Sequence, residues 1–416
     1  MSHFKSKTLV VVGGGAAGFF CAINAAQMSP NLQVIIVEKN NKLLSKVKIS
    51  GGGRCNVTHA CFDIVELSKK YPRGEKFLKK AFHWFNTNST IDWFANRGVQ
   101  LKTEADGRMF PESNTSETII DCLLNQANKL GVTIFTSVGV KDITKQNGKF
   151  EVILDNKNLK NLQADFVCIA SGGFPKLEQF NWLQQLGHTI ENPIPSLFTF
   201  NIPNNNITQL MGVSVEKATV KIVGSKLQSE GALLITHWGL SGPAVLKLSA
   251  FAARELANKN YSFEAVVNWL PNHNEQTLKE VFLEFRSSIA SQKISGKNSF
   301  GLPYRLWDYL LQLCAIDKDL RWADLSSKKQ NDLIKNLTSQ LFKVSGKTTF
   351  KEEFVTCGGI KLTEVDVNTM QSKIADNIFF AGEVLDIDGI TGGFNFQNAW
   401  TTGWIAAKAI AQKSLE

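Results

Sequence analysis

The chain has 416 residues, 43% of them hydrophobic and 20% charged, which is an ordinary composition for a protein with a large buried core. Its formal net charge of +9 at pH 7 favours anionic partners but does not decide among them, because net charge bears on partners and not on fold. Seven cysteines, odd in number and scattered, exclude a complete disulfide framework and predict reduced thiols in a cytoplasmic protein.

No segment predicts a membrane span or a signal peptide. Residues 8–37 lack Asp, Glu, Lys and Arg over a length that would cross a bilayer, but four glycines, two asparagines, two glutamines and a proline interrupt them. The apolar run near the N-terminus is short, and no small-residue cleavage site follows it. We therefore expect folded structure here and no membrane partner.

A nucleotide-binding motif follows the first predicted strand. The run "TLVVVG" predicts a buried parallel strand, and "GGGAAG" places Gly13, Gly15 and Gly18 at the G-x-G-x-x-G spacing. A helix rich in small residues follows, and "LQVIIVEKN" predicts a second strand that ends at Glu38. In such a unit the first glycine permits a tight turn, the second admits a pyrophosphate, and the third lets helix and strand pack closely. The helix start attracts phosphate, and Glu38 is placed to accept hydrogen bonds from an adenosine ribose.

The C-terminal segment predicts a second helix start that follows a glycine turn. The run "IFFAGE" predicts a strand that leads into Gly382 and Glu383, and Gly392 and Gly393 make a tight turn before a helix from Asn395. In a flavoprotein this helix start would face the pyrimidine edge of the isoalloxazine, where its positive end stabilises charge on reduction. Glu383 would hold the ribityl hydroxyls. The alternative is a core helix with a glycine-rich entry loop.

Six motifs occur in order along the chain: "VVGGGAAG", "SGGGRCNVTH", "GRMFP", "ITHWGLSGPA", "VTCGGI" and "AGEVLDIDGITGGFN". Together they resemble the BaiN-type NAD(P)/FAD-dependent oxidoreductases, a family with aminoacetone oxidase-like and bile-acid-reductase-like members. The resemblance covers nearly the whole chain. It implies an α/β fold with a glutathione-reductase-type Rossmann FAD-binding domain, interrupted by a β-rich domain that carries a helical subdomain. It does not imply a substrate, because activities within the family differ.

The resemblance also implies where noncovalent FAD is held. Val140 would lie near the adenine, and the strand "ADFVCIASGG" would bring its end near the FAD phosphates. The segment after that strand is shorter than is usual in the family, so contacts from the missing stretch stay open. The expected cofactor-binding residues are Gly13, Gly15, Ala16, Ala17, Gly18, Glu38, Lys39, Ser50, Gly51, Gly52, Gly53, Arg54, Cys55, Asn56, Val140, Ala170, Ser171, Gly172, Gly173, Gly382, Glu383, Asp386, Gly392, Gly393, Phe394 and Asn395.

The segment "SGGGRCNVTHAC", residues 50–61, admits three interpretations. A zinc site is the weakest, because its cysteines and histidine are tightly spaced and no second ligand pair follows, so we expect no metal. A redox pair of Cys55 and Cys61 is the second interpretation, but the two cysteines are farther apart in sequence than the pair in glutathione-reductase relatives. We favour a backbone cradle, in which Ser50 and Arg54 donate hydrogen bonds to phosphate or to flavin N5 and O4.

The catalytic candidates are fewer. His237 in "THWGLSGP" is a candidate proton donor with Trp238 beside the flavin, although a histidine that anchors the loop is the alternative. Arg54 is a second candidate in the cradle. Arg108 in "GRMFP" is placed either to bind a substrate carboxylate or to form a structural ion pair.

The run "KKYPRGEKFLKK", Lys69 to Lys80, mixes basic residues with Tyr71 and Phe77, as nucleic-acid contacts do. A solvated amphipathic face is the favoured interpretation, so nucleic acid is not the expected partner. An RNA-interacting flavoprotein stays open as an alternative. The composition does not indicate an oligomeric state.

The domain organisation follows from the changes in pattern along the chain. Within the first domain, Ser89 and Asp92 predict a capping box, and Asn147-Gly148 predicts a hairpin turn. We expect an FAD-binding domain in residues 1–190 and 355–416, a β-rich domain in 191–270 with a return through 343–354, and a helical subdomain in 271–342.

These patterns predict an FAD-dependent oxidoreductase that transfers hydride at flavin N5 to or from a small organic substrate. Both amine oxidation and enone reduction stay open, because the flavin performs either. The sequence has no second G-x-G-x-x-G, so NAD(P)H, if it is the electron donor, would enter the same pocket transiently. A dithiol oxidoreductase that uses Cys55 and Cys61 is the second alternative.

Overall fold

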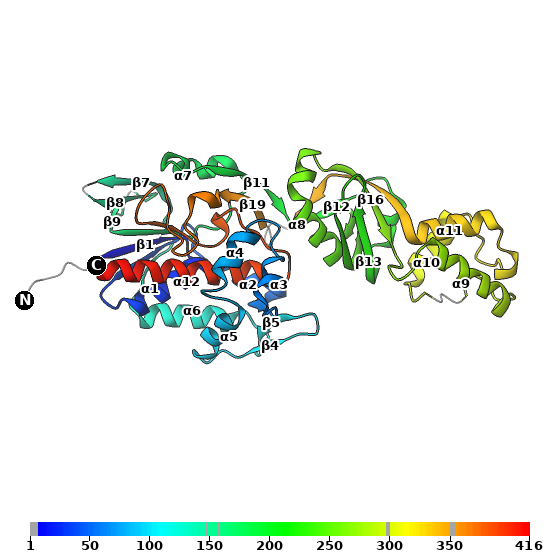
Figure 1. Cartoon of the computed structure of the whole chain (residues 1–416), viewed down its shortest axis with the longest axis horizontal. Helices are drawn as coiled ribbons and strands as arrows, with labels where there is room; N and C mark the ends of the chain where they lie inside the picture. The colour runs from blue at the N-terminus through cyan, green and yellow to red at the C-terminus, as the bar shows by residue number, and fades with distance from the viewer. Residues whose placement is uncertain (1–6, 147, 157, 297–299, 350–354) are drawn as a thin grey trace, which may run out of the picture. The chain divides into compact units, whose positions relative to one another are not determined.

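The computed structural model describes residues 7–146, 148–156, 158–296, 300–349 and 355–416. The chain forms two compact units, Met1–Ser196 with Lys351–Glu416, and Leu197–Phe350 (Figure 1). Within the described residues, no helix has both the length and the apolar character that a membrane crossing requires.

A parallel sheet forms the centre of the first unit, as the sequence predicted. Its five strands run in the order β20-β10-β1-β2-β6, and every neighbouring pair is parallel. The central strands are almost continuous runs of Val, Ile and Leu, as expected where both faces are covered. The strands are β1 (Thr8–Val12), β2 (Gln33–Val37), β6 (Thr133–Phe135), β10 (Phe166–Ile169) and β20 (Ile378–Phe380).

Two helices from opposite ends of the sequence pack together on this unit. Helix α1 (Ala16–Met28) and helix α12 (Phe394–Leu415) lie side by side in Figure 1. A Cβ added to Gly18 would lie 1.9 Å from the carbonyl oxygen of Gly13, and one added to Gly403 would lie 2.8 Å from the carbonyl oxygen of Ala17. Glycine is therefore required at both positions, since any side chain would push α1 away from its neighbours.

Shorter elements surround the sheet. Strands β3 (Thr58–His59), β5 (Arg108–Pro111) and β4 (Leu101–Thr103) form one small sheet, and β7 (Val140–Gln146), β8 (Lys149–Leu154) and β9 (Leu162–Ala164) form another. Strands β11 (Ile190–Ser196) and β19 (Val355–Ile360) pair antiparallel. The helices are α2 (Ser45–Gly53), α3 (Ile64–Ser68), α4 (Glu75–Ala81), α5 (Thr87–Ala95), α6 (Glu117–Lys129) and α7 (Asn181–Gln185).

The predicted cap of α5 was wrong by one turn. The capping box is formed by Asn86 and Ser89, because the Asn86 side chain accepts from the Ser89 backbone N–H and the Ser89 hydroxyl bonds the Asn86 backbone. Asp92 lies within the helix. The predicted hairpin between β7 and β8 is present, although Asn147 itself lies outside the described residues.

The second unit contains a seven-stranded antiparallel sheet in the order β17-β16-β13-β14-β15-β12-β18. Its strands are β12 (Thr199–Asn201), β13 (Ser214–Ile222), β14 (Gln228–Thr236), β15 (Gly239–Ser241), β16 (Ser262–Asn268), β17 (Gln340–Ser345) and β18 (Lys347–Thr348). Its helices are α8 (Pro243–Asn258), α9 (Glu275–Ser288), α10 (Tyr304–Leu313) and α11 (Ser327–Ser339). The helix-rich stretch after residue 275 agrees with the sequence analysis.

Helix α8 interrupts a region that the sequence analysis treated as strands. Proline occupies its first turn, where the missing N–H costs nothing, and Val245, Leu248, Ala252 and Leu256 are buried at helical spacing. The strands and helices of this unit share one apolar core that includes Phe200, Trp307 and Val344 among many others.

Candidate cofactor site

The turn after β1 brings the chain close to the end of β10. Gly13 adopts φ +114°, and a Cβ added there would lie 2.4 Å from the carbonyl oxygen of Ala170. The Gly13 N–H donates to the carbonyl of Val37 at 2.8 Å, which ties the turn to β2. The first glycine of the motif therefore does the steric work that the sequence predicted for it.

Gly15, at the start of α1, presents backbone to open space. It is the N-cap residue, no side chain caps the helix there, and a Cβ added to it would meet no atom within 4 Å. Ala16 and Ala17 continue the first turn with equally small side chains. The helix start thus combines a partial positive charge with an unobstructed approach for an anion.

Glu38 closes this turn from the end of β2. Its carboxylate accepts from the Gly14 N–H at 2.7 Å and from the Asn40 backbone and side-chain N–H groups at 2.9 and 2.8 Å. Two oxygens offer about four acceptor sites, so the side chain retains acceptor capacity. The neighbouring Lys39 is exposed, with its Nζ 5.3 Å from the centre of the Phe174 ring.

The glycine run of residues 51–53 forms the end of α2 with left-handed backbone. Gly51, Gly52 and Gly53 have φ values of +59°, +70° and +84°, which disfavour other residues. A Cβ on Gly52 or Gly53 would meet no atom within 4 Å. This stretch offers bare backbone, as a cradle requires, while the Ser50 hydroxyl donates to the Val47 carbonyl at 3.0 Å.

The two cysteines of the segment are free thiols. Cys55 is fully buried, and burial raises the pKa of its thiol to about 12, although a hydrogen bond with Ser50 opposes the shift. Partial burial also raises the pKa of Cys61, against the opposing charge of Lys70. Neither thiol is set up as a thiolate nucleophile. The described residues contain no group of three or more His, Cys, Asp or Glu that could hold a metal ion.

The glycine segment and the C-terminal turn lie against each other. Gly392 and Gly393 adopt φ values of +123° and +94° at the start of α12. The Asn56 carboxamide bridges the Thr58 carbonyl and the Gly393 N–H, each at 3.0 Å. His59 Nδ1 lies 3.0 Å from the Gly392 carbonyl oxygen. The segment of residues 50–61 and the glycine turn before α12 are therefore in direct contact.

His59 also stacks on Phe394, with ring centres 4.7 Å apart. The Asn395 carboxamide does not point away from the protein as a free ligand group. It donates to the Gly389 carbonyl at 2.9 Å and accepts from the Gly389 N–H at 2.8 Å, which closes the loop before α12.

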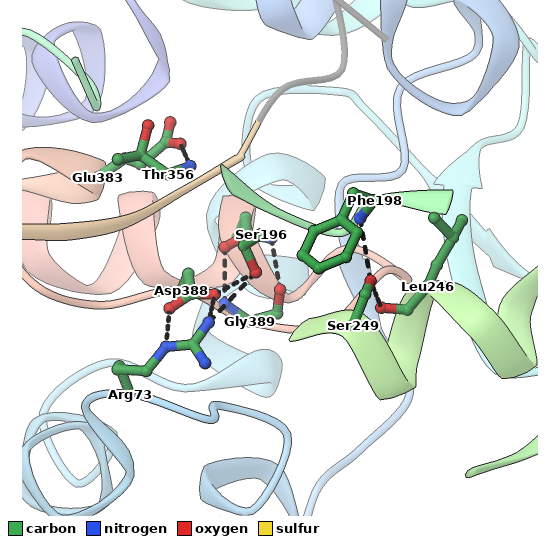
Figure 2. A network of polar contacts seen from close by, with 10 residues as sticks. Arg73, Ser196, Phe198, Leu246, Ser249, Thr356, Glu383, Asp388 and Gly389 are labelled. Atoms are coloured by element: carbon green, nitrogen blue, oxygen red, sulfur yellow. Dashed lines mark hydrogen bonds and ion pairs between the residues drawn. The ribbon is translucent and has the colours of Figure 1, made fainter. Parts of the chain in front are cut away.

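Gly382 contacts the first turn of α1 and the third turn of α12. A Cβ added to it would lie 2.8 Å from the Ala17 Cβ, and its N–H donates to the Thr402 hydroxyl at 2.8 Å. The adjacent Glu383 accepts from the Thr356 N–H at 2.8 Å, a contact drawn in Figure 2, and pairs with Lys46 at 2.6 Å. Glu383 is therefore part of the same small region as α1 and β19.

The end of β10 completes the region. A Cβ added to Gly173 would lie 2.5 Å from the Thr356 hydroxyl oxygen and 3.1 Å from the Glu383 carboxyl carbon. Gly172 has φ +75°, and a Cβ there would meet no atom within 4 Å. Ser171, between them and Ala170, is half-buried.

Comparison with known proteins decides the family. A family model described as "HI0933-like protein Rossmann domain" matches residues 7–409. The chain belongs to the HI0933-like family. The α/β fold class with a Rossmann domain is confirmed.

Curated relatives of this HI0933-like protein match almost end to end. It is 26% identical to a 3-dehydro-bile acid delta(4,6)-reductase of Clostridium scindens over 97% of this chain and 98% of the relative. It is 29% identical to a ribosomal RNA dihydrouridine synthase of Escherichia coli, with the same coverages, and 27% identical to one of Haemophilus influenzae over 99% of this chain and 100% of the relative. A 3-ketosteroid delta1-dehydrogenase from Sterolibacterium denitrificans shares the fold, with a TM-score of 0.53 at 12% identity over 98% of this chain and 100% of that chain.

A buried ion pair that the sequence analysis did not foresee supports the loop before α12 (Figure 2). Arg73 Nε donates to Asp388 Oδ1 at 2.5 Å, and Arg73 Nη2 donates to Asp388 Oδ2. The Ser196 hydroxyl donates to Asp388 Oδ2 at 2.6 Å. Burial, with a smaller contribution from the neighbouring Asp386, raises the pKa of Asp388, while Arg73 and Ser196 oppose that shift. Asp386 is itself buried.

Arg54 and Arg108 share one carboxylate. Glu104 accepts from Arg54 Nη1 at 2.5 Å and from Arg108 Nη2 at 3.1 Å, and Arg108 also pairs with Asp106 at 2.7 Å. The Arg54 guanidinium lies 4.0 Å from the centre of the Phe110 ring. The sequence offered two roles for Arg108, binding of a substrate carboxylate or a structural ion pair, and the structure contains the ion pair.

Two further predicted residues lie on other elements, His237 directly after β14 and Val140 in β7. His237 belongs to the second unit, where its exposed ring lies edge-on to Trp238 with centres 4.2 Å apart. Trp238 Nε1 donates to the Thr199 hydroxyl at 2.9 Å. Val140 is half-buried at the start of β7.

Proposed function

We propose that this protein is an FAD-dependent reductase of a carbon–carbon double bond conjugated to a carbonyl, and that its substrate is uridine in ribosomal RNA. A 3-dehydro delta(4,6) compound and the uracil ring both contain such a bond. The names of the relatives therefore support a single reaction type on two substrate classes. Enone reduction was one of the two reactions that the sequence left open.

The cradle supports FAD as the cofactor. Gly15, Gly52, Gly53 and Gly172 are positions where an added Cβ would meet nothing, so a ligand can reach the backbone there. The hydroxyl oxygen of Thr356 is buried and has no hydrogen-bond partner among the described residues, which a bound ligand would provide. In this proposal the predicted residues around Gly13–Gly18, Glu38, residues 50–56, residues 170–173 and residues 382–395 hold the cofactor.

Bound FAD would supply hydride for the carbon β to the substrate carbonyl. The α12 N-terminus, which Gly393 opens, would stabilise negative charge beside it. A proton must also reach the carbon α to the carbonyl. Arg54, held by Glu104 and Phe110, would position the glycine segment. NADH or NADPH would reduce the cofactor in the same pocket.

Ribosomal RNA is favoured over a small enone for two reasons. Two relatives with that named substrate match 97% and 99% of this chain, and the net charge of +9 suits a polyanion. This gives RNA more weight than the sequence alone did, where a small molecule was preferred.

The test is a direct product assay. Protein that contains FAD would be mixed anaerobically with NADH or NADPH and with ribosomal RNA from a strain that lacks the gene, and dihydrouridine would be measured by mass spectrometry of the digested nucleosides. We expect dihydrouridine at a defined position with one nicotinamide. RNA that gains no dihydrouridine, with a flavin that the nicotinamide bleaches normally, would refute the substrate assignment.

A small enone is the second candidate, because the bile acid reductase is 26% identical over 98% of its length. The same anaerobic assay with a 3-oxo-delta4 steroid separates the two substrates. Turnover of the steroid without turnover of RNA would select the small-molecule function.

A further inference from the structure

Helix α4 and the turn before it divide the basic run into an inner and an outer side. Tyr71 and Arg73 point inward, since the Tyr71 hydroxyl donates to the Phe394 carbonyl at 2.7 Å and Arg73 forms the buried ion pair. Lys76, Lys79 and Lys80 are exposed. They are spaced i, i+3 and i+4, which places them on one face of the helix with Cβ atoms about 5–6 Å apart.

This lysine face lines an open groove. The groove runs between α4 and residues 362–373 and has a volume of ≈ 1020 Å³. Lys373 lies on its other side, where its Nζ donates to the Thr363 carbonyl at 3.1 Å, so four lysines face two carboxylates, Glu75 and Asp366, in the lining. A surface of this charge attracts anions, and the repulsion among three lysines on two turns of helix is relieved when a polyanion binds.

Aromatic side chains accompany the lysines. Phe77 lines the groove, and Trp84 follows the end of α4 with 44% of its surface exposed. Trp84 Nε1 donates to Asn368 Oδ1 at 3.4 Å, and Asn368 is itself in the lining, so the indole lies at the rim. Lys408 Nζ lies 3.9 Å from the centre of the Trp84 ring. Phe77 is half-buried and Trp84 is exposed, and aromatic rings beside a basic track are what single-stranded nucleic acid uses for stacking.

We propose that this groove, defined by Lys76, Lys79, Lys80 and Lys373 with Phe77 and Trp84, binds a single-stranded segment of RNA through its phosphates. The inference rests on the proposed function, because it identifies where the ribosomal RNA is held outside the reacting base. The groove has a volume at the upper end of the range for small-ligand pockets, about 300–1,000 Å³, and it is open along the surface, which suits a chain. The acidic pair Glu75 and Asp366 leaves the net charge of the lining positive.

The experiment compares two triple variants of the full FAD-containing protein. The groove variant is Lys76→Glu, Lys79→Glu and Lys80→Glu. The control variant is Lys129→Glu, Lys160→Glu and Lys279→Glu, three exposed lysines outside the groove lining that give the same change in net charge. The Lys→Arg version of the groove variant tests rescue. Binding of a labelled 20-nucleotide oligouridylate and of a polyphosphate of equal charge would be measured against salt, with the visible flavin spectrum as the check on folding.

We expect the groove variant to bind the oligouridylate at least about tenfold more weakly, with the salt slope reduced by about 2, since each lost contact with single-stranded phosphate contributes about 0.7. The control variant should lose far less, and the Lys→Arg variant should bind as the wild type does. Equal losses in the groove and control variants, or no loss in the groove variant, would overturn the proposal. So would polyphosphate binding as tight as that of the oligouridylate.

The two proposals fail separately. Wild-type protein that makes dihydrouridine while the groove variant keeps its RNA affinity would overturn the groove alone. Wild-type protein that binds RNA through the groove but makes no dihydrouridine would overturn the proposed reaction and support the groove.

Discussion

Removal of the Asp388 carboxylate should destabilise the first unit strongly. Asp388→Leu leaves the Arg73 guanidinium, whose side chain is only 8% exposed, without its two charge-assisted hydrogen bonds and leaves Ser196 without its acceptor. Breaking a buried ion pair by removal of one partner costs about 3–5 kcal/mol. The double variant Arg73→Met, Asp388→Leu removes both charges and should recover most of that loss, because apolar replacements of a buried pair are often close to neutral.

The measurement is urea unfolding followed by hydrogen exchange and mass spectrometry, which reports separately on peptides around Tyr71 and around Asp388. Both peptides belong to the first unit, and comparing them with peptides of residues 197–350 matters because the two units need not unfold together. A single variant that costs less than about 1 kcal/mol would refute the reasoning. So would a double variant as unstable as the single one, since the damage would then come from packing and not from charge.

Three further predictions concern the cradle and the buried polar groups. Gly15→Ala should keep the unfolding free energy within about 1 kcal/mol, because the added Cβ meets no atom, yet it should weaken FAD affinity about tenfold or more. Gly18→Ala should lower the unfolding free energy by about 1–3 kcal/mol or more, because the added Cβ overpacks the contact with Gly13. Urea unfolding and flavin titration measure both variants. Cys55→Ser and Cys61→Ser should each keep nicotinamide-dependent turnover with FAD bound; loss of turnover in both would favour the dithiol chemistry. Burial lowers the pKa of His188, and the opposing effect of Glu364 is smaller. The stability that neutral His188 provides is therefore present above its unfolded pKa of about 6.5 and is lost as pH falls through the lower folded pKa. Between pH 7 and 5 the wild type should therefore lose more unfolding free energy than His188→Gln, and equal losses would contradict the assignment.

The sequence alone was sufficient to predict those parts of the fold where a position accepts only glycine for a single steric reason. The spacing of Gly13, Gly15 and Gly18 between two apolar runs requires a turn, an open helix start and a close packing contact, and the structure contains all three. The glycine pair at 392–393 followed the same logic. Local patterns of this kind do not depend on distant parts of the chain.

Long-range pairing was beyond such patterns. Arg73 and Asp388 are separated by 315 positions, and nothing near Arg73 distinguishes a buried partner of a distant carboxylate from a solvated base. The same holds for Tyr71, which the sequence placed among surface residues and which is buried against Phe394. Helix α8 was predictable from local sequence, because it begins with a proline and its apolar residues have helical spacing. The prediction of strands throughout this region was wrong there. How Arg54 and Arg108 share Glu104 also could not be predicted, since a loop fixes that geometry.

The order of the chain sets the order of biosynthesis. The unit built from residues 197–350 leaves the ribosome before β20 and α12 exist. The first unit needs both elements, because β20 is a strand of its parallel sheet and α12 supplies its second helix start. Domains generally fold as units while synthesis continues. During translation the nascent N-terminal half must therefore wait without the strand that pairs with β10, and the candidate cofactor site is completed only after β20 and α12 have been made.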